Sequence, residues 1–340
     1  MPRVSVIMSI YKEPVDWIVQ SIDSILDQSF QDFEFIIVND NPERGDNARL
    51  LKEYEQKDSR VFIISNDDNI GLTKSLNKAL DTAQGEYVAR MDADDISMPT
   101  RFETQINYLD SHPEICALGC WTRIINENGE LIGETVKYEY DPRWVKALFL
   151  QNSQLCHPTA MFRRIINNFP IRYDELSEYA QDYSLWVSLL PFGDITNIPA
   201  PLFHYRTSGQ QLSSSKKIAQ QECARVAQRE AFALFDIPVS DAFSRLFFEM
   251  TIQHKKDLPI VKVKSEFRSF FNNVEITRKN TLALELLYKV FLIFLKRNCG
   301  PSTIHFLISA IKSSSLRMLS LGLKLCVHTC HKNLGNYYLS

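Results

Sequence analysis

The chain has 340 residues, of which 45% are hydrophobic, and a formal net charge of −3. This length and apolar content suffice for a large buried core, and the lack of a charged start followed by a long apolar stretch predicts no secretory signal and a cytoplasmic amino end. The seven cysteines lack the paired spacings of a zinc site, so we expect reduced, structural thiols. Fourteen Lys and Arg against four Asp and Glu give the chain from residue 255 onward a charge of +10, which leaves −13 for residues 1–254. We therefore expect the two parts to face different partners.

Short apolar runs alternate with amphipathic patterns in the first third of the chain. Continuous Val, Ile and Phe runs predict strands buried on both faces over residues 4–10, 33–39, 60–66 and 86–91. Apolar residues at helical spacing predict helices over residues 15–28, 47–57 and 71–83. This alternation predicts an α/β fold with a parallel sheet, whose ligands bind at the carboxyl ends of the strands.

Polar segments follow three of these strands: YKEP (residues 11–14), NDNPERG (39–45) and DADD (92–95). All three are therefore expected to face one crevice. Further along, residues 122–133 predict a hairpin around Asn128 and Gly129. Residues 177–190 predict a helix, and the chain after Ser213 is mostly helical in pattern.

The acidic segment is the strongest chemical signal. In an extended segment Asp92 and Asp94 point to the same side, where two carboxylates repel each other unless a cation lies between them. Mg²⁺ and Mn²⁺ prefer such oxygen ligands and often keep phosphate oxygens as further ligands. The alternative is a solvated acidic loop before a helix that is capped near Ser97, with Pro99 in its first turn.

Seven segments in order carry a family resemblance: VSVIMSIYKEP, SILDQSFQDFEFIIVNDN, DNIGLTKSLNKAL, GEYVARMDADDISMPTRFE, CHPTAMFRR, AQDYSLW and HYRTSGQQLS. Together they resemble a family 2 glycosyltransferase of the bacterial surface-polysaccharide type, with the GT-A nucleotide-sugar-binding fold. The resemblance implies a GT-A catalytic domain over residues 1–215. Its nucleotide-sugar-binding half would span 1–100 and its acceptor half 101–215, followed by a basic helical C-terminal region over 216–340.

The resemblance also assigns the nucleotide end of the site. It places Ile10, Tyr11 and Glu13 along the nucleotide pocket, and Asp40 on the uracil ring if the donor is a UDP sugar. A carboxylate accepts hydrogen bonds only, which suits a base N–H donor. Many relatives carry another acid where this chain has Asn39, and Asp40 is also a common residue type in turns.

For the metal, the resemblance implies Mn²⁺ or Mg²⁺ with Asp94 as a direct ligand and Asp92 on the ion or on the donor ribose or sugar. Asp95 could serve the ion or the helix that follows. Arg90 and Lys74 would counter the donor charge, although Lys74 lies in an amphipathic helix and could face water.

Many relatives carry a His two places after the YR pair, where it completes the metal shell, and this chain has Ser208. Either His204 substitutes for it, or the diphosphate and water fill the site, or metal dependence is loose. Arg206 would contact the diphosphate, since a guanidinium matches phosphate oxygens.

The resemblance places the catalytic base at Asp182, after Gln181 where relatives usually carry Glu. Trp186 shares its helix face and would either stack on an acceptor sugar or belong to the core. Partial burial near Trp186 would raise the pKa of Asp182. Glu178 is a reserve base, and His157 would orient the acceptor or satisfy a loop hydrogen bond.

The basic C-terminal region has three interpretations. Its apolar stretches over residues 281–330 are too short to span a bilayer. Lys312, Arg317 and Lys324 fall on one side of a helical wheel, which is typical of a helix on an anionic membrane surface. A packed helical appendage is the alternative, and nucleic-acid binding has no accompanying motif.

The resemblance implies an inverting transfer of a sugar from a nucleotide-sugar donor, a UDP-hexose or UDP-N-acetylhexosamine, to a lipid-linked glycan acceptor. Capsule, exopolysaccharide or O-antigen synthesis at the inner face of the plasma membrane would be its setting. A nucleotidyltransferase is the first alternative, but SIYKEP supplies no glycine-rich loop after the first strand. A catalytically inactive GT-A-like binding protein is the second.

Overall fold

A computed structural model describes residues 1–208, 217–253, 258–275, 277, 281–284 and 286–287. Lys312, Arg317 and Lys324, and with them most of the predicted membrane-contact region, lie outside the described residues. The chain divides into two compact units. The first comprises Met1–Lys146 and Ser153–Ala227, and the second comprises Ala147–Asn152 and the chain from Gln228 onward.

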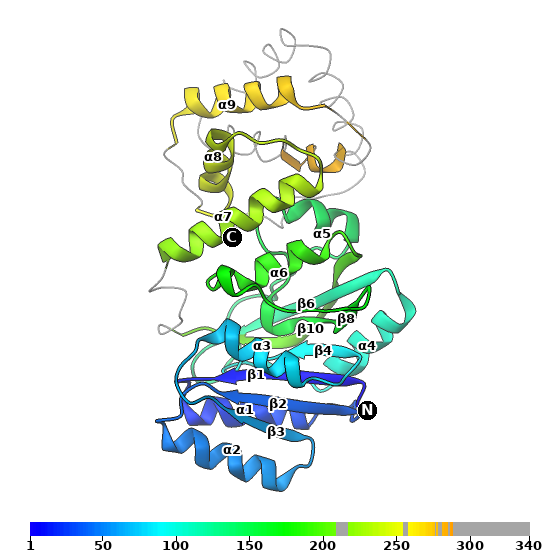
Figure 1. Cartoon of the computed structure of the whole chain (residues 1–340), viewed down its shortest axis with the longest axis vertical. Helices are drawn as coiled ribbons and strands as arrows, with labels where there is room; N and C mark the ends of the chain where they lie inside the picture. Colours follow the sequence, from blue (N-terminus) through cyan, green and yellow to red (C-terminus); the bar gives the residue numbers. More distant parts are fainter. Residues whose placement is uncertain (209–216, 254–257, 276, 278–280, 285, 288–340) are drawn as a thin grey trace. The chain divides into compact units, whose positions relative to one another are not determined.

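The first unit is built on an eight-stranded sheet (Figure 1). Its strands, in spatial order, are β3 (Val61–Ser65), β2 (Phe33–Asn39), β1 (Val4–Ile10), β4 (Tyr87–Arg90), β7 (Met161–Arg163), β6 (Ile115–Ile125), β10 (Asp194–Arg206) and β5 (Ile96–Ser97). The first four are parallel to one another, as the sequence predicts. Antiparallel pairing begins at β7, while β6 and β10 run parallel to each other.

The predicted strands and helices of the first third form, but β3 is not buried on both faces as predicted, because it lies at the edge of the sheet and only Val61 in it is buried. Every residue of β1 and β2 is buried, because helices cover the sheet. The helices are α1 (Val15–Leu26), α2 (Gly45–Lys57) and α3 (Leu72–Thr82). In α1 the buried residues Ile18, Ile22 and Ile25 recur at helical spacing, and each such burial contributes about 1.5–3 kcal/mol.

The predicted hairpin also forms, at the end of β6. Asn126 donates its N–H to the Glu130 carbonyl at 2.9 Å, and an isolated bridge pairs Ile125 with Leu131. Gly129 has a φ of 82°, a left-handed conformation that a side chain would disfavour. Helix α4 (Arg101–Ser111) precedes β6, and α5 (Pro142–Leu148) follows the hairpin.

The predicted helix over residues 177–190 is shorter than expected. A 3₁₀ turn, η2 (Glu175–Ser177), comes first and is capped by the Asp174 carboxylate, which accepts the Leu176 N–H at 3.0 Å. Ala180 then leaves helical geometry with a φ of −143°, so α6 spans Gln181–Leu189. Before this turn come η1 (His157–Thr159) and a short hairpin of β8 (Ile165–Ile166) and β9 (Phe169–Pro170).

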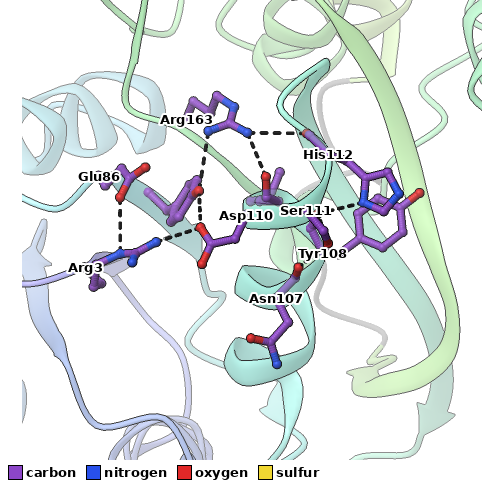
Figure 2. Close-up of polar contacts among 10 residues, drawn as sticks. Arg3, Glu86, Asn107, Tyr108, Asp110, Ser111, His112 and Arg163 are labelled. Atoms are coloured by element: carbon purple, nitrogen blue, oxygen red, sulfur yellow. Dashed lines mark hydrogen bonds and ion pairs between the residues drawn. The ribbon is translucent and has the colours of Figure 1, made fainter.

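Charged residues pair with one another at the amino ends of β1 and β4 (Figure 2). Arg3 Nε lies 3.2 Å from Glu86 Oε2, and Arg3 Nη2 lies 2.7 Å from Asp110 Oδ1. Arg163, from β7, donates to the carbonyl of Leu109 in α4 at 2.8 Å. This amino-edge network, consisting of Arg3, Glu86, Asp110 and Arg163, therefore joins β1, β4, β7 and α4.

The second unit is helical in its described part, which agrees with the predicted helical appendage. Helix α7 (Lys217–Leu234) leads into it, followed by α8 (Asp241–Thr251) and α9 (Ile260–Asn273). Its core contains stacked phenylalanines, with the Phe243 and Phe270 rings 4.2 Å apart. Within the described residues, every helix is too short or too polar to cross a bilayer.

Candidate active site

The acidic loop, residues 92–95, follows β4 at the carboxyl edge of the sheet. The chain turns at Ala93 and Asp94 instead of remaining extended, yet one carboxylate oxygen each from Asp92, Asp94 and Asp95 lies within 4.8 Å of the others. Asp95 is 1% exposed, and its Oδ2 is buried without a hydrogen-bond partner. An orphaned oxygen among three carboxylates fits a hard divalent cation such as Mn²⁺ or Mg²⁺. In the part of the chain that the structure describes, His204 does not join this group.

Side chains from distant elements hold the backbone of the acidic loop. Ser21 Oγ of α1 donates to the Asp92 carbonyl at 2.7 Å. Arg206 Nε, at the end of β10, donates to the Asp94 carbonyl at 2.6 Å, and the Arg206 N–H donates to Asp95 Oδ1 at 2.7 Å. These contacts join the backbone of the acidic loop to α1 and to the end of β10, and one of them holds the Asp95 carboxylate directly.

The structure changes the role expected of Arg206. Its side chain is fully buried and donates to the carbonyls of Asn126 and Glu127 at 3.1 Å and to Gln20 Oε1 at 2.8 Å. Its guanidinium also lies over the Trp17 ring, 5.0 Å from the centroid. Because its N–H groups donate hydrogen bonds to acceptors inside the protein, Arg206 supports the acidic loop instead of facing a diphosphate.

The structure also gives Arg90 a role other than the expected one of countering the donor charge. The fully buried Arg90 forms an ion pair with Asp92 through Nη2, while its Nε and Nη1 have no hydrogen-bond partner. A side chain buried in this way counters the charge of Asp92 and cannot reach a donor directly. A second buried arginine, Arg101 of α4, donates to the Arg90 carbonyl at 2.7 Å and thereby fixes the end of β4.

Burial and mutual repulsion perturb the acids strongly. Burial, and then the Asp92 carboxylate, raise the pKa of Asp94 to about 7. Burial, and then Asp94, raise the pKa of Asp95 well above its usual range. Burial also raises the pKa of Glu13, with a smaller contribution from Asp92. A bound dication would reverse these shifts, because it favours the ionised carboxylates.

The end of β1 supplies one wall of the site through Tyr11 and Glu13. Both side chains are partly exposed, and Glu13 Oε2 accepts the Tyr11 N–H at 2.7 Å. Ile10 is fully buried in the core, so its side chain does not line a pocket as predicted. Its carbonyl instead accepts the Asp40 N–H at 2.9 Å, which joins the ends of β1 and β2.

Asp40 organises the loop that leads into α3. Its Oδ1 accepts hydrogen bonds from Asn66 Nδ2 at 2.8 Å and from the Ile70 N–H at 2.9 Å, and its Oδ2 accepts the Gly71 N–H at 3.0 Å. A carboxylate has about four lone-pair positions, so these three bonds leave capacity for one further donor. Lys74, on α3, is exposed.

Asp182 lies in the first turn of α6 and is partly exposed. Burial raises its pKa, the direction expected for a general base. Trp186, on the same helix, is fully buried and meets Phe162 and His157 edge-on at 5.8 and 6.2 Å. Trp186 therefore belongs to the core, which is the second of its two predicted alternatives, and its buried indole does not stack on an acceptor sugar.

His157 makes a contact within the protein. Its Nε2 lies 2.8 Å from the Tyr173 hydroxyl, and burial lowers the pKa of His157 well below its usual value, which favours the neutral ring. Glu178, the reserve base, is exposed and precedes α6, so it does not lie on the helix that carries Asp182. Its carbonyl accepts from Thr73 Oγ1 at 3.4 Å.

Residues 5–168, which include the acidic loop, match the family model described as glycosyl transferase family 2. The chain is 35% identical over 234 residues to the O-antigen biosynthesis glycosyltransferase WbnJ of Escherichia coli, covering 68% of this chain and 89% of WbnJ. The chain belongs to glycosyltransferase family 2. This glycosyltransferase is also 39% identical over 186 residues to an uncharacterized glycosyltransferase of Methanocaldococcus jannaschii, which covers 55% of this chain and 64% of that relative.

Solved structures confirm the GT-A fold of this family 2 glycosyltransferase. Residues 1–349 of TarS from Staphylococcus aureus, in complex with UDP-GlcNAc, superpose with a TM-score of 0.54 at 17% identity, covering 87% of this chain and 81% of that one. The mannosyltransferase PcManGT from Pyrobaculum calidifontis, in complex with GDP-Man and Mn²⁺, has a TM-score of 0.53 at 16% identity, with 96% and 87% coverage.

Proposed function

We propose that this glycosyltransferase moves a sugar, with inversion, from a nucleotide-sugar donor to a lipid-linked glycan acceptor in the synthesis of a bacterial surface polysaccharide. The observation that carries the proposal is the group of three carboxylates within 4.8 Å at the carboxyl edge of the sheet. The O-antigen role in the name of WbnJ supports the polysaccharide setting. UDP-GlcNAc in TarS supports a UDP-hexose or UDP-N-acetylhexosamine donor, and GDP-Man in PcManGT is the alternative to test.

In this proposal Asp92, Asp94 and Asp95 hold a divalent cation, and the Mn²⁺ in PcManGT supports that assignment. When bound, the ion supplies positive charge to the leaving diphosphate. Arg206 and Ser21 keep the carboxylates in place through the loop backbone. Because the aspartates are oriented before binding, little reorganisation is needed when the donor arrives.

Asp182 is the proposed general base. It removes the proton of the acceptor hydroxyl as that oxygen forms a bond to the anomeric carbon, while the bond from that carbon to the diphosphate oxygen breaks and the diphosphate takes its electron pair. Attack opposite the leaving group inverts the anomeric centre. The support is the position of Asp182 in the first turn of α6, partly exposed and with a pKa raised by burial.

The donor base is proposed to meet the loop before α3. Asp40 keeps capacity for one further hydrogen-bond donor, as a base N–H would supply. Tyr11 and Glu13 border the same region, and the exposed Lys74 is free to approach donor phosphates. The Asp40 carboxylate only accepts hydrogen bonds, whereas the neutral amide of Asn39 beside it can also donate them. The preference of the protein for one nucleotide base over another is therefore a direct test of this assignment.

We also propose a place at the inner face of the plasma membrane, with the basic C-terminal region contacting anionic lipid. The charge of +10 from residue 255 onward supports this proposal. Co-sedimentation of the full chain with anionic and neutral vesicles tests it. Binding to anionic vesicles that falls with added salt is expected, and equal binding to both vesicle types contradicts it.

A thermal-unfolding screen tests the donor proposal. UDP-glucose, UDP-galactose, their N-acetylhexosamine counterparts and GDP-mannose are each added with and without Mn²⁺. A donor at 100 times its Kd stabilises the protein by about 2.7 kcal/mol, so a matching donor raises the melting temperature with Mn²⁺. Absence of any shift contradicts the proposal, and a shift without release of nucleotide diphosphate favours the inactive binding protein.

A further inference from the structure

Helix α3 is hydrogen-bonded to the chain segment that precedes the proposed base, Asp182. Asn77, on α3, is 2% exposed, and its side-chain amide bonds both backbone groups of Tyr173. Asn77 Oδ1 accepts the Tyr173 N–H at 2.9 Å, and Asn77 Nδ2 donates to the Tyr173 carbonyl at 3.0 Å. Nδ2 also lies 3.1 Å from Glu175 Oε1. One buried side chain thus satisfies both backbone groups of Tyr173, which lies outside the strands found in the described part of the chain.

Tyr173 connects Asn77 to α6 through contacts between side chains. It is buried, and its hydroxyl lies 2.8 Å from His157 Nε2. The His157 ring meets Trp186 edge-on at 6.2 Å, and Trp186 is fully buried on α6. Asp182 precedes Trp186 by four residues on that helix, so the two share a face. Packed side chains therefore connect Asn77 to the helix that carries Asp182.

The same helix begins at the nucleotide end of the site. Gly71, which immediately precedes α3, donates its N–H to Asp40 Oδ2 at 3.0 Å. Thr73, in the first turn of α3, donates to the Glu178 carbonyl at 3.4 Å. One continuous helix thus contacts both the carboxylate proposed for the donor base and the segment before Asp182.

We propose that Asn77 is a positioning residue that holds Asp182 in register through Tyr173 and His157, so that α3 ties the base to the nucleotide end of the site. This inference rests on the proposed function, in which Asp182 is the base. The physical reason is that a general base must lie within about 2.6–3.2 Å of the proton it removes. A misplacement of about 1 Å can cost on the order of 100-fold in rate.

Asn77→Ala in the full chain tests the proposal. The measurement is steady-state release of nucleotide diphosphate from the sugar donor identified by the thermal screen, in Mn²⁺, corrected for the folded fraction. We expect kcat to fall by about 10- to 100-fold, while the KM for the donor changes by less than about threefold. A purely structural role would lower the melting temperature and leave kcat per folded enzyme unchanged, which would overturn the proposal.

Two further variants sharpen the test. Tyr173→Phe keeps the backbone bonds to Asn77 and removes only the hydroxyl contact with His157, so it is informative even if Asn77→Ala fails to fold. We expect a lower kcat, and we expect the double variant to lose little more than the stronger single variant, because the two residues act in series. A normal kcat for Tyr173→Phe, or fully additive losses, contradicts the connection through His157.

Asp81→Asn is the matched control. Asp81 lies on α3 and forms an exposed ion pair with Arg172, at the same junction but away from His157. We expect its kcat to be unchanged, and an equal loss in this variant would overturn the specific role of Asn77. The proposed function fails separately: full turnover in Asp182→Asn removes the base assignment, whereas an inactive Asp182→Asn with a normal Asn77→Ala removes only this inference.

Discussion

At the amino edge of the sheet, Arg3 lies 3.2 Å from Glu86 and 2.7 Å from Asp110, so each of these charges has an opposite partner (Figure 2). At the carboxyl edge, three aspartates gather in the acidic loop beside Arg90, which pairs with Asp92. The amino-edge charges join secondary-structure elements to one another. At the carboxyl edge, burial and the mutual repulsion of the carboxylates raise the pKa values of Asp94 and Asp95, which costs stability unless a ligand compensates.

The difference separates charges that maintain the fold from charges that await a ligand. Partly exposed ion pairs such as those of Arg3 contribute about 0–1 kcal/mol each. Buried carboxylates without sufficient positive charge around them are retained although they lower stability. Groups whose pKa values are perturbed in this way concentrate at functional sites. Substitutions at the two edges should therefore have opposite signatures: small effects on stability at one, and large effects on activity at the other.

The largest effect is expected for Asp182→Asn. An amide has nearly the same shape as the carboxylate but cannot accept the proton, so kcat should fall by about 10²- to 10⁴-fold. The thermal shift caused by donor and Mn²⁺ should be retained. Turnover is measured by release of nucleotide diphosphate, and an unchanged rate would remove Asp182 as the base.

Asp94→Asn should lower kcat by on the order of 10²- to 10³-fold, because the leaving diphosphate loses the charge that a correctly held cation supplies. The Mn²⁺-dependent thermal shift should also be lost. In the absence of metal this variant should melt at a higher temperature than the parent, since one repelling carboxylate is gone.

Glu86→Gln at the amino edge is its matched control, since it also replaces one carboxylate by an amide. Its ion pair with Arg3 is partly exposed, so we expect a change of about 0–1 kcal/mol in the free energy of unfolding and normal turnover. Similar losses of activity in Asp94→Asn and Glu86→Gln would end the distinction between the two edges.

Arg206→Lys tests whether Arg206 positions the acidic loop. Lysine keeps the charge but cannot reproduce the bonds to the Asp94, Asn126 and Glu127 carbonyls. Each buried acceptor left without a partner costs about 1–3 kcal/mol. We expect a lower melting temperature and about tenfold weaker apparent Mn²⁺ affinity, measured by the intrinsic tryptophan fluorescence, to which Trp17 beside Arg206 contributes. Lower stability with unaltered Mn²⁺ affinity would show that Arg206 does not position the carboxylates.

The final expected effect is a pH dependence of the stability of the metal-free protein. The pKa of Asp94 is raised to about 7 in the folded protein from the ordinary value of 3.8. Between these values the folded state binds more protons than the unfolded state, so Asp94 makes metal-free stability fall as the pH rises from about 4 to about 7. Melting temperatures in a chelator should show this fall more steeply in the parent than in Asp94→Asn. Mn²⁺ should suppress it, and parallel curves would contradict the perturbed acid.

The sequence predicts much of the fold because its signals are local. The buried strands of the first third, the helices between them and the hairpin at Gly129 each follow from a short apolar run, a helical spacing or a turn residue. The sequence predicts the start of α6 at residue 177 instead of 181, because the helical pattern runs on from the end of the 3₁₀ turn at Ser177 into the helix. Local pattern does not distinguish these two kinds of helix.

Part of the site could not be predicted, because its contacts join distant segments. Trp186 has the helical spacing expected of either a core residue or a sugar platform, and only its full burial decides between them. The sequence does not single out Ser21, Asn77 and Arg101, because their hydrogen-bond partners are backbone groups elsewhere in the chain. Backbone acceptors leave no trace in the residue types of the partner segment.

By itself, the sequence determined that acids follow parallel strands and gather at one edge of a sheet, since strand order and strand ends depend on local runs. The tertiary structure decided which carboxylates have a partner and which residue provides it. Arg206 lies 111 residues beyond Asp95 and yet binds it. The physical reason is that a buried charge takes its partner from whatever packs against it in three dimensions, and the fold chooses that neighbour.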